Sequence, residues 1–355
     1  MRVEIGIEAR QKAAASMVEG LAMSCGMKAD ESDHNGFSLL ELCRESLRVA
    51  NQPTGGHTME VITRAMTTSD FPNILSNVAS KSMLAGFEAE APTWQKWCSV
   101  GSLPNFKIST LHRVSGADAL DLITESEPYS YGTIDETKEE ICLATYGKLF
   151  AVTRQAIIND DLEALTNIPM AHGEAAARKI GDLVYSILTG NPTMGDGKTL
   201  FHAGHSNILT PAIIGESTLS EAIRKMALQK DSKGRALNVN PRFIIAPRTL
   251  EGAAEVFFGS HQFSDNDTAS TRTNIYSGAR FTRIYDARLD DASTTAWYVA
   301  ADPGKTVKVF FLNGQQAPAL EQQAGWNVDG VEYKVRIEAA AKALDWRGLS
   351  RNLGA

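Results

Sequence analysis

The strongest hydrophobic pattern in the chain lies near its middle, between Asp160 and Gly190. In the second half of this stretch, apolar residues recur at the spacing of one helical face: Ala176, Ile180, Leu183, Val184 and Ile187. Asp160 and Asp161 stand where carboxylates suit a helix N-terminus, and Gly190 stands where a C′ glycine ends a helix. Pro169 predicts a break or bend, because proline lacks an N–H and collides with the preceding turn. The pattern therefore predicts a helical rod about 45 Å long.

Residues 1–90 carry helical patterns separated by polar linkers and show no strand pattern. The predicted helices cover residues 8–24, 37–50 and 71–85, and the linkers include KADESDHNG and NQPTGGH. Helices this short, joined by exposed linkers, could not form a substantial core by themselves. We therefore interpret residues 1–90 as an extended arm that packs on another body, such as a neighbouring subunit.

Between residues 100 and 150 the period changes to the alternation of a half-buried strand. Strands are predicted at 106–114, 129–134 and 140–145, and the stretch between the first two is acidic and weakly apolar. We interpret Asn105–Glu140 as a long two-stranded projection, whose persistence would imply docking on a partner, since an isolated hairpin is only marginally stable in water. Two edge strands of an ordinary sheet would give a similar pattern, so that alternative stays open.

Residues 199–306 alternate between helical and strand patterns, and from Phe281 onward the pattern is that of strands. Helices are predicted at 219–229 and 250–258, and strands at 242–247, 281–289, 296–301, 307–314 and 331–339. Asp302–Lys305 has the composition of a type II turn, and Asp329-Gly330 that of a hairpin turn. The chain as a whole is predicted to be α+β.

Composition agrees with a folded globular protein. The 355 residues are 43% hydrophobic and 22% charged, enough for two or three compact units. No window approaches about 18 consecutive apolar residues, so no membrane span is expected, and the first twenty residues lack an apolar signal core. Four widely spaced cysteines without a CxxC pair favour reduced thiols in a cytosolic setting. A formal charge of −7 argues against a protein that wraps nucleic acid with a basic face, but not against a container around it.

The motifs that could carry chemistry are few. His202 and His205 are the most tempting, because two imidazoles three residues apart can share a metal when a carboxylate completes the ligand set. No third ligand is evident, so simple loop histidines are favoured over a metal-dependent hydrolase. Gly197-Lys198-Thr199 is excluded as a phosphate loop, because the required glycine is replaced by Pro192 and a helix, not a strand, precedes it. We expect no enzyme activity, metal or cofactor.

Trp94 and Trp97 lie three residues apart on a predicted helical turn after Pro92. Core packing is the default interpretation of such a pair. An anchor between subunits is the alternative, since aromatic side chains dominate interface energetics.

Several segments resemble the major capsid proteins of tailed bacteriophages, specifically the Mu-like major head subunit group. The resemblance covers about residues 65–355 and is carried, in consistent order, by TTSDFPNILSNVASKSML, YGKLFAVTRQAIINDDLEAL, AARKIGDLVYSILTGNPTMGDGKTLFHAGHSN, PRFIIAPRTLEGAA, FTRIYDARLDDASTTAWYVAADP, VFFLNGQQAPALE and LDWRGLSRN. No single segment is catalytic or unique, so the specificity comes from the ordered set. Residues 1–65 match less well, and we interpret them as a scaffold-like extension that is trimmed or retained on maturation.

The resemblance implies the Hong Kong 97 capsid fold, with an N-terminal arm, an extended β loop, a peripheral domain with a long spine helix, and an axial domain. The implied divisions are residues 1–90 for the helical arm, 91–145 for the extended loop and flanks, 146–198 with 307–355 for the peripheral domain, and 199–306 for the axial domain. The implied function is a major capsid protein that self-assembles as hexamers and pentamers into an icosahedral shell enclosing double-stranded phage DNA, without sequence-specific binding. Its implied place is the virion, after assembly in the host bacterial cytoplasm and without a membrane.

Further partners implied by the resemblance are a portal, a scaffold or prohead protease, and decoration proteins. Candidate contacts between subunits are Trp94, Trp97, Lys107, Arg154, Asp286, Arg288, Asp345 and Arg347. The charged residues among the family-like segments are expected to form charge-assisted contacts, either between subunits or inside the peripheral domain, with ordinary surface pairs as the alternative. Some relatives form a Lys–Asn crosslink, and Lys107 and Lys138 lie where such a lysine would sit. The rival functions are an encapsulin-like compartment with protein cargo and a small soluble oligomer.

Overall fold

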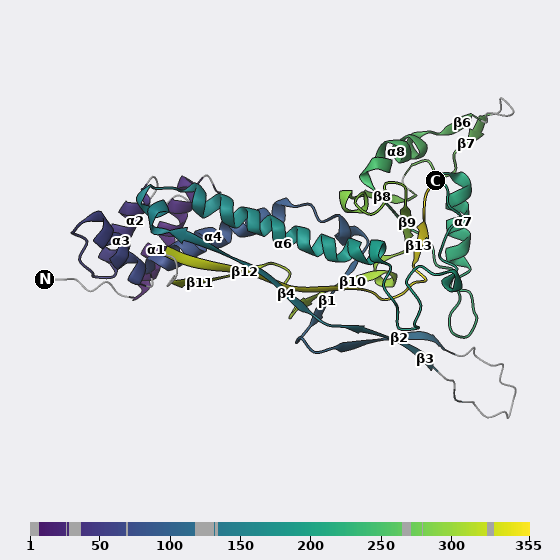
Figure 1. Cartoon of the computed structure of the whole chain (residues 1–355), viewed down its shortest axis with the longest axis horizontal. Coiled ribbons are helices and arrows are strands. Elements are labelled where there is room, and N and C mark those ends of the chain that lie inside the picture. Colours follow the sequence, from purple (N-terminus) through teal and green to yellow (C-terminus); the bar gives the residue numbers. More distant parts are fainter. Residues whose placement is uncertain are drawn as a thin grey trace. The chain divides into compact units, whose positions relative to one another are not determined.

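The computed structural model describes residues 7–25, 27, 37–68, 70–117, 131, 134–264, 271–278, 280–324 and 330–355. The chain forms two compact units, each built from three separate segments. The first unit consists of residues 1–91, 145–179 and 315–338, and the second of residues 92–144, 180–314 and 339–355. Helices and sheets are mixed in both units (Figure 1), which confirms the predicted α+β class. The division into arm, loop, peripheral domain and axial domain stays a prediction.

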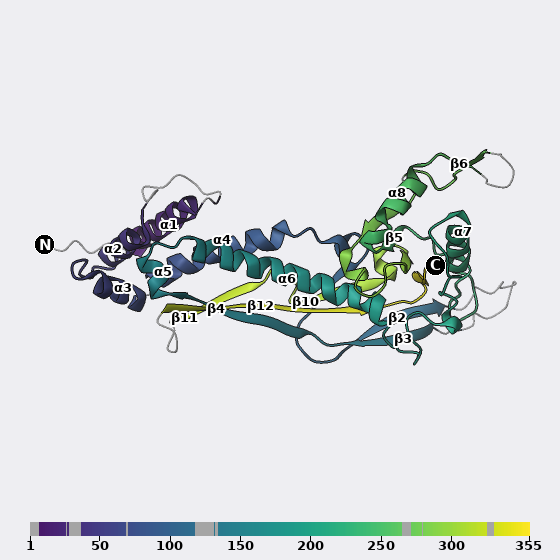
Figure 2. The ribbon, with the colours of Figure 1, turned by 45° about the horizontal axis from the view of Figure 1, so that its top comes forward.

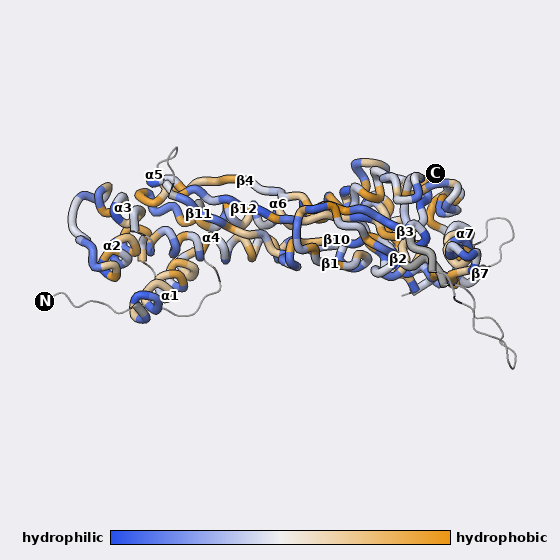
Figure 3. The backbone as a smooth tube through the Cα atoms, turned by 90° about the horizontal axis from the view of Figure 1, so that it is seen from below, coloured by the Kyte–Doolittle hydropathy of each residue, from blue (hydrophilic) through white to orange (hydrophobic). Residues whose placement is uncertain are grey.

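The first unit combines a helical bundle with part of a sheet. Its elements are α1 (Ile7–Ser24), α2 (Leu39–Val49), α3 (Thr58–Thr67), α4 (Asp70–Ala89), β4 (Ala144–Thr153), α5 (Arg154–Ile158), the first part of α6 (Glu163–Gly190), β11 (Ala319–Ala324) and the first part of β12 (Gly330–Ala343). Strand β12 pairs antiparallel with β11, from Val331↔Ala324 to Arg336↔Ala319, and also pairs with β4. Figure 3 shows the polar β11 and the more apolar β4 of this sheet.

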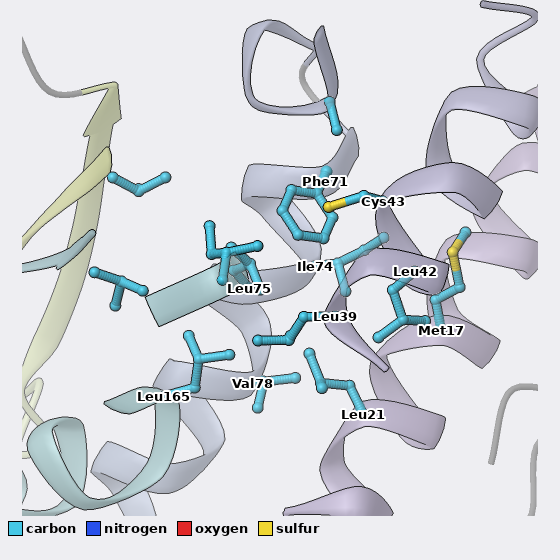
Figure 4. Packing of buried hydrophobic residues seen from close by; sticks show 14 of the residues in the cluster. Met17, Leu21, Leu39, Leu42, Cys43, Phe71, Ile74, Leu75, Val78 and Leu165 are labelled. Carbon is cyan, nitrogen blue, oxygen red and sulfur yellow. The ribbon is translucent and has the colours of Figure 1, made fainter. Parts of the chain in front are cut away.

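The expectation that the helices of residues 1–90 form no substantial core by themselves is wrong, whereas their role as an arm stays a prediction. Side chains from α1, α2 and α4 converge in one buried cluster (Figure 4), which contains Met17, Leu21, Leu39, Leu42, Cys43, Phe71, Ile74, Leu75, Val78 and Leu165. The cluster also takes in Val331 and Tyr333 of β12. The helices therefore bury one another, and residues that follow much later in the sequence complete the cluster, which local patterns do not reveal.

The start of α2 shows how such a distant partner acts. Ser38 accepts a hydrogen bond from the Glu41 N–H, and the Glu41 carboxylate accepts one from the Ser38 N–H, which is a complete capping box. The next donor, the Leu39 N–H, bonds to Asp160 Oδ1 at 2.7 Å. Asp160 was predicted to open the central helix, but it has a left-handed backbone (φ 56°) and instead caps α2.

The central helix α6 runs unbroken from Glu163 to Gly190, so the break or bend predicted at Pro169 does not interrupt it. Close packing on α4 holds the helix through this point, and the two helices run side by side (Figure 2). A Cβ on Gly86 would collide with the Met170 carbonyl, and one on Gly173 would collide with the Met83 carbonyl. At the other end, Gly190 is the last helical residue, and Asn191 takes the left-handed C′ position (φ 48°) predicted for that glycine.

The second unit contains a four-stranded sheet and most of the chain's turns. Its helices are α7 (Glu216–Ala227), α8 (Glu251–Gly259) and the 3₁₀ turns Thr93–Lys96, Ala203–His205, Arg248–Leu250, Ala287–Leu289 and Pro303–Lys305. Its strands are β1 (Ser99–Leu103), β2 (Ser109–Ala117), β3 (Ile134–Ile141), β5 (Phe243–Ala246), β6 (Gln262–Ser264), β7 (Thr271–Thr273), β8 (Thr282–Tyr285), β9 (Trp297–Ala300), β10 (Val307–Leu312) and β13 (Leu349–Asn352).

The four-stranded sheet has the order β13-β9-β5-β8, with β9 antiparallel to both neighbours and β5 parallel to β8. Every residue of β5 and β9 is buried, and Trp297, Val299 and Ile244 form a core with Phe258 of α8 and Met226 of α7. Strand β10 pairs parallel with β1 and antiparallel with residues 339–343 of β12, as part of the same five-stranded sheet as β11 and β4.

Several local predictions need correction. The strand predicted at 281–289 ends at Tyr285, because Asp286 caps a 3₁₀ turn by accepting a hydrogen bond from the Arg288 N–H. The predicted type II turn at 302–305 is also a 3₁₀ turn. Helix α3 and strands β1, β6, β7, β11 and β13 were missed, and the strand predicted at 140–145 spans the break between β3 and β4. Asp329 of the predicted hairpin turn and most of the strand predicted at 129–134 lie outside the described residues, and Gly330 is the first residue of β12.

Candidate assembly interface

The hairpin formed by β2 and β3 is the strongest candidate for a contact between subunits. The strands pair antiparallel from Ser109↔Ile141 to Ala117↔Ile134, with a bulge between Val114 and Gly116. Near the foot of the hairpin, Thr110, His112, Thr137, Lys138 and Glu140 are all exposed. The two-stranded projection predicted between residues 105 and 140 is therefore present. It offers the polar side chains of these five residues to solvent.

The foot of the hairpin is fixed to its own unit. Ile141 lies in a small apolar core with Leu103 of β1 and Phe310 of β10. The Glu139 carboxylate accepts a hydrogen bond from the Gly195 N–H at 2.7 Å and pairs with Lys342 Nζ at 3.3 Å. A Cβ on Gly195 would collide with the Lys138 carbonyl, so glycine permits this close approach. The hairpin thus leaves the unit in a defined direction.

The turn at Gly195 and Asp196, which contacts the hairpin, is held in place by His205. The buried imidazole places Nε2 2.7 Å from Asp196 Oδ2 and Nδ1 3.2 Å from the Leu200 carbonyl. It stacks on Trp346 with ring centroids 4.3 Å apart and planes 4° apart. Burial would raise the pKa of Asp196, but hydrogen bonds from His205 and from the Lys198 N–H outweigh burial and lower it. His205 and Asp196 therefore position the turn against the hairpin.

Replacing Asp196 by alanine is expected to lower the free energy of unfolding by about 1 kcal/mol at pH 7, after allowance for solvent screening of this half-exposed carboxylate. Because the pKa of Asp196 is lower in the folded than in the unfolded chain, its stabilisation is complete at neutral pH and is lost as the pH falls through the folded-state value. The difference between the wild type and Asp196→Ala should therefore shrink in acid. Urea denaturation at pH 7 and pH 3.5 measures it.

The matched control is Asp302→Ala, which removes an ion pair with Arg242 whose two side chains are 60% and 62% exposed. Exposed pairs contribute about 0–1 kcal/mol, so this change should be near neutral. A constant difference between the wild type and Asp196→Ala at both pH values would contradict the assignment.

Both ring nitrogens of His205 and one of His202 make contacts within the protein. Both nitrogens of His205 face protein acceptors, and His202 Nδ1 accepts a hydrogen bond from the Gly204 N–H at 2.9 Å. In the part of the chain that the structure describes, no three His, Cys, Asp or Glu side chains gather in a way that could hold a metal ion. The geometry supports the interpretation of His202 and His205 as loop histidines.

Trp94 and Trp97 are buried within their own unit, with 3% and 0% of their surface exposed. The Trp97 ring lies 6.2 Å from that of Tyr185 on α6, and the Trp97 carbonyl accepts a hydrogen bond from Thr306 Oγ1. This burial within their own unit favours core packing, and a role of the two indoles between subunits stays a prediction.

Asp286 and Arg288 contact other parts of the same unit. Arg288 bonds to Asp182 of α6 at 2.7 Å and to Asp286 at 3.1 Å, and Asp286 also accepts a hydrogen bond from Thr93. Burial would lower the pKa of Arg288, but Asp182 and Asp286 outweigh burial and raise it. These charge-assisted contacts lie within one chain, and a role of Asp286 and Arg288 between subunits stays a prediction.

The remaining predicted contact residues divide into buried and exposed groups. Arg347 is 8% exposed, donates to the Lys230 carbonyl at 2.7 Å, pairs with Asp345 at 3.6 Å and lies over the Trp346 ring. Lys107 is exposed and Arg154 is half-buried, and their roles between subunits stay predictions.

Exposed apolar side chains mark surfaces that the sequence pattern did not reveal. Phe106 and Ile108, predicted to lie on the buried face of a strand, precede β2 and are 46% and 67% exposed. Leu149 of β4, Val256 of α8 and Ile213 are each about 70% exposed. The alternation of apolar and polar residues along a strand cannot identify such exposed side chains, because it does not say which face of the strand the subunit itself covers.

No helix in the described residues is both long enough and apolar enough to span a membrane.

Comparison with known proteins points to one family. A family model described as phage capsid protein matches residues 138–352. No curated protein matches the sequence. The chain is similar to the solved capsid of a native GTA particle, with 10% identity and a TM-score of 0.52 over 75% of this chain and 91% of that chain.

Two further structures are similar to a lesser degree. The capsid of Myoviridae phage XM1 gives 12% identity and a TM-score of 0.48 over 75% of this chain and 92% of that chain. The holo-SrpI encapsulin complex from Synechococcus elongatus PCC 7942 gives 11% identity and a TM-score of 0.43 over 74% and 87%.

Proposed function

Because the chain belongs to the phage capsid protein family, we propose that it is a major capsid subunit that assembles as hexamers and pentamers into a closed icosahedral shell around double-stranded DNA. Its fold is that of the Hong Kong 97 type of phage capsid. Its role is structural. The chemistry of assembly is then non-covalent, and each subunit must present surfaces that only a neighbour covers.

The observation that supports the proposal is the β2–β3 hairpin, which is held at its foot by buried Ile141 and by Glu139 and whose polar residues near the foot are exposed. The charge of this region is unusual. Residues 118–140 contain eight Asp or Glu and one Lys, a formal charge of −7, and the whole chain, with 35 basic and 42 acidic residues, also has −7. The rest of the chain is therefore neutral overall. Such a loop repels its own copies and favours less acidic surfaces of a neighbour.

The proposal also assigns a role to each of the four regions defined from the sequence. Residues 1–90 are the N-terminal helical region, 91–145 the loop between subunits, 146–198 with 307–355 the peripheral domain, and 199–306 the axial domain. A portal, a scaffold or prohead protease and decoration proteins are the proposed further partners. Assembly in the cytoplasm of a bacterial host and location in the virion complete the proposal.

Replacing residues 118–133 by Asn-Gly is expected to abolish shell formation while leaving the subunit folded. The replacement closes the hairpin directly beyond the Ala117↔Ile134 pair with a two-residue turn that suits the twist of antiparallel strands. The cores of both units lie outside the replaced segment. Negative-stain electron microscopy of the soluble fraction measures assembly, and thermal unfolding measures folding.

The matched control is the other described hairpin, in which Asn-Gly in place of residues 265–270 closes β6–β7 beyond the Ser264↔Thr271 pair. This variant tests whether shortening a hairpin affects folding as such. Shells formed by the 118–133 variant would remove the loop from the assembly mechanism. A wild-type chain that stays a monomer or small oligomer would sink the capsid proposal itself. Protein cargo in place of DNA inside purified phage-derived shells would favour the encapsulin-like alternative.

A further inference from the structure

A cavity of about 440 Å³ lies within the first unit, between β4, α6 and β12. This volume falls in the range of small-molecule sites in proteins, about 300–1,000 Å³. Its walls are mostly apolar and come from Tyr146 of β4, Ala175 and Ala176 of α6, and Val335 and Ile337 of β12.

The space exists because small residues line the contact between the helix and the sheet. Ala175 and Ala176 extend only a methyl group toward the sheet side that other helical residues would fill. Gly147 lets β4 approach β12 so closely that a Cβ would lie 2.8 Å from the Val335 carbonyl. A larger side chain at these positions would close the cavity or push the strands apart.

The charges around the cavity are all positive. Lys148, Lys179 and Arg336 line it, and no Asp or Glu does. Arg336 is already paired with Glu321 at 2.8 Å and Glu338 at 3.3 Å. Across the described residues, no carboxylate lies within ion-pair distance of Lys148 or Lys179, and Lys179 Nζ sits 4.8 Å from the centre of the Tyr146 ring.

The imidazole of His172 also lines the cavity. Burial, and to a smaller extent the nearby Lys148, lowers the pKa of His172. The imidazole stacks on Phe150 with ring centroids 5.2 Å apart. Within the described residues, Lys148 and Lys179 thus stand at the edge of an apolar cavity without a carboxylate partner, and an anionic occupant would supply one.

We propose that this cavity binds a small amphiphilic anion, a single carboxylate carried on an apolar chain. The carboxylate neutralises the lysine-lined edge, and the chain displaces water from the walls formed by Ala175, Ala176 and Ile337. A polyphosphate or nucleic-acid backbone fits less well, because it needs several donors and would press charge against apolar walls. A neutral apolar molecule would leave the ammonium groups of Lys148 and Lys179 without a counter-charge.

The test is calorimetric titration of the full-length chain with decanoate at pH 7. One decanoate per chain is expected, with decanol at least tenfold weaker because it lacks the charge. Each methylene added between hexanoate and decanoate should lower Kd about fourfold, the ratio that corresponds to burial of one CH₂. No saturable binding, or equal binding of decanol and decanoate, overturns the proposal.

Variants locate the site. Ala175 is exposed, so Ala175→Phe should leave the fold intact while filling the cavity, and we expect it to abolish binding. Lys179→Met keeps the side-chain length and should raise Kd about tenfold. Lys96→Met, an exposed lysine of the second unit, is the control and should bind like the wild type. Undiminished binding by Ala175→Phe would place the ligand elsewhere and overturn the assignment. Because the cavity lies within one chain, this result does not depend on shell formation.

Discussion

Deletion of residues 1–65 is expected to yield a chain that does not fold into a soluble subunit. The deletion removes α1, α2 and most of α3, which cover the inner face of α4. Phe71, Ile74, Leu75 and Val78 would be exposed, at a cost of about 1.5–3 kcal/mol for each side chain. The sum rivals the whole stability of an ordinary domain, about 5–15 kcal/mol. The soluble fraction after expression and hydrogen exchange of α4 measure the effect.

Point variants on one helix give a matched control for the deletion. Leu21→Ala removes a fully buried side chain of α1 and should cost about 2–5 kcal/mol. Met23→Ala, two residues away on the same helix, changes a side chain that is 38% exposed and should cost under about 0.5 kcal/mol. A soluble truncated chain with an unchanged unfolding midpoint would restore the interpretation of residues 1–65 as a removable, scaffold-like extension.

Gly173→Ala is expected to lower the free energy of unfolding by about 2 kcal/mol or more, although alanine is the best helix former. The added methyl group would collide with the Met83 carbonyl and lie 2.9 Å from the Phe87 amide nitrogen of α4. Neither backbone group can rotate away, so α4 and α6 must separate. Chemical denaturation, followed by far-UV circular dichroism, measures the loss.

The same substitution at the end of the same helix should act in the opposite direction. Gly190 is helical and a Cβ there meets nothing within 4 Å, so Gly190→Ala should stabilise the chain by about 0.5 kcal/mol. Equal effects at the two positions would show that helix propensity, and not the contact with α4, determines the result. Gly86→Ala, which meets the Met170 carbonyl from the other side, should resemble Gly173→Ala.

The sequence predicts elements whose pattern is local and strong. The apolar stripe of α6, the buried strand β5 and the helix α7 were located because their periodicity does not depend on distant residues. The Ser38–Glu41 capping box was readable in the sequence and would have fixed the start of α2. Strand β11, with the polar sequence ALEQQA, gives no alternation and exists only through its pairing with β12.

The candidate interface could be predicted only in outline. The β2–β3 projection followed from strand period and turn composition, but the anchors at its foot did not. Glu139 meets Gly195 56 residues later in the chain, and Asp182 meets Arg288 106 residues later. A charged residue in a sequence shows that it needs a partner, but not whether that partner belongs to the same chain. For Asp286, Arg288 and Arg347 the partner does belong to the same chain.

The discontinuous make-up of both units constrains the order of events during synthesis. A ribosome makes α1 to α4 first, but their core is closed by Val331 and Tyr333 of β12. The four-stranded sheet likewise gains its edge strand β13 only when Asn352 has been translated. Nascent chains on one polysome therefore carry incomplete units until late in translation. Under the proposed capsid role, a nascent chain cannot offer either complete unit to a neighbour before β12 and β13 have been made.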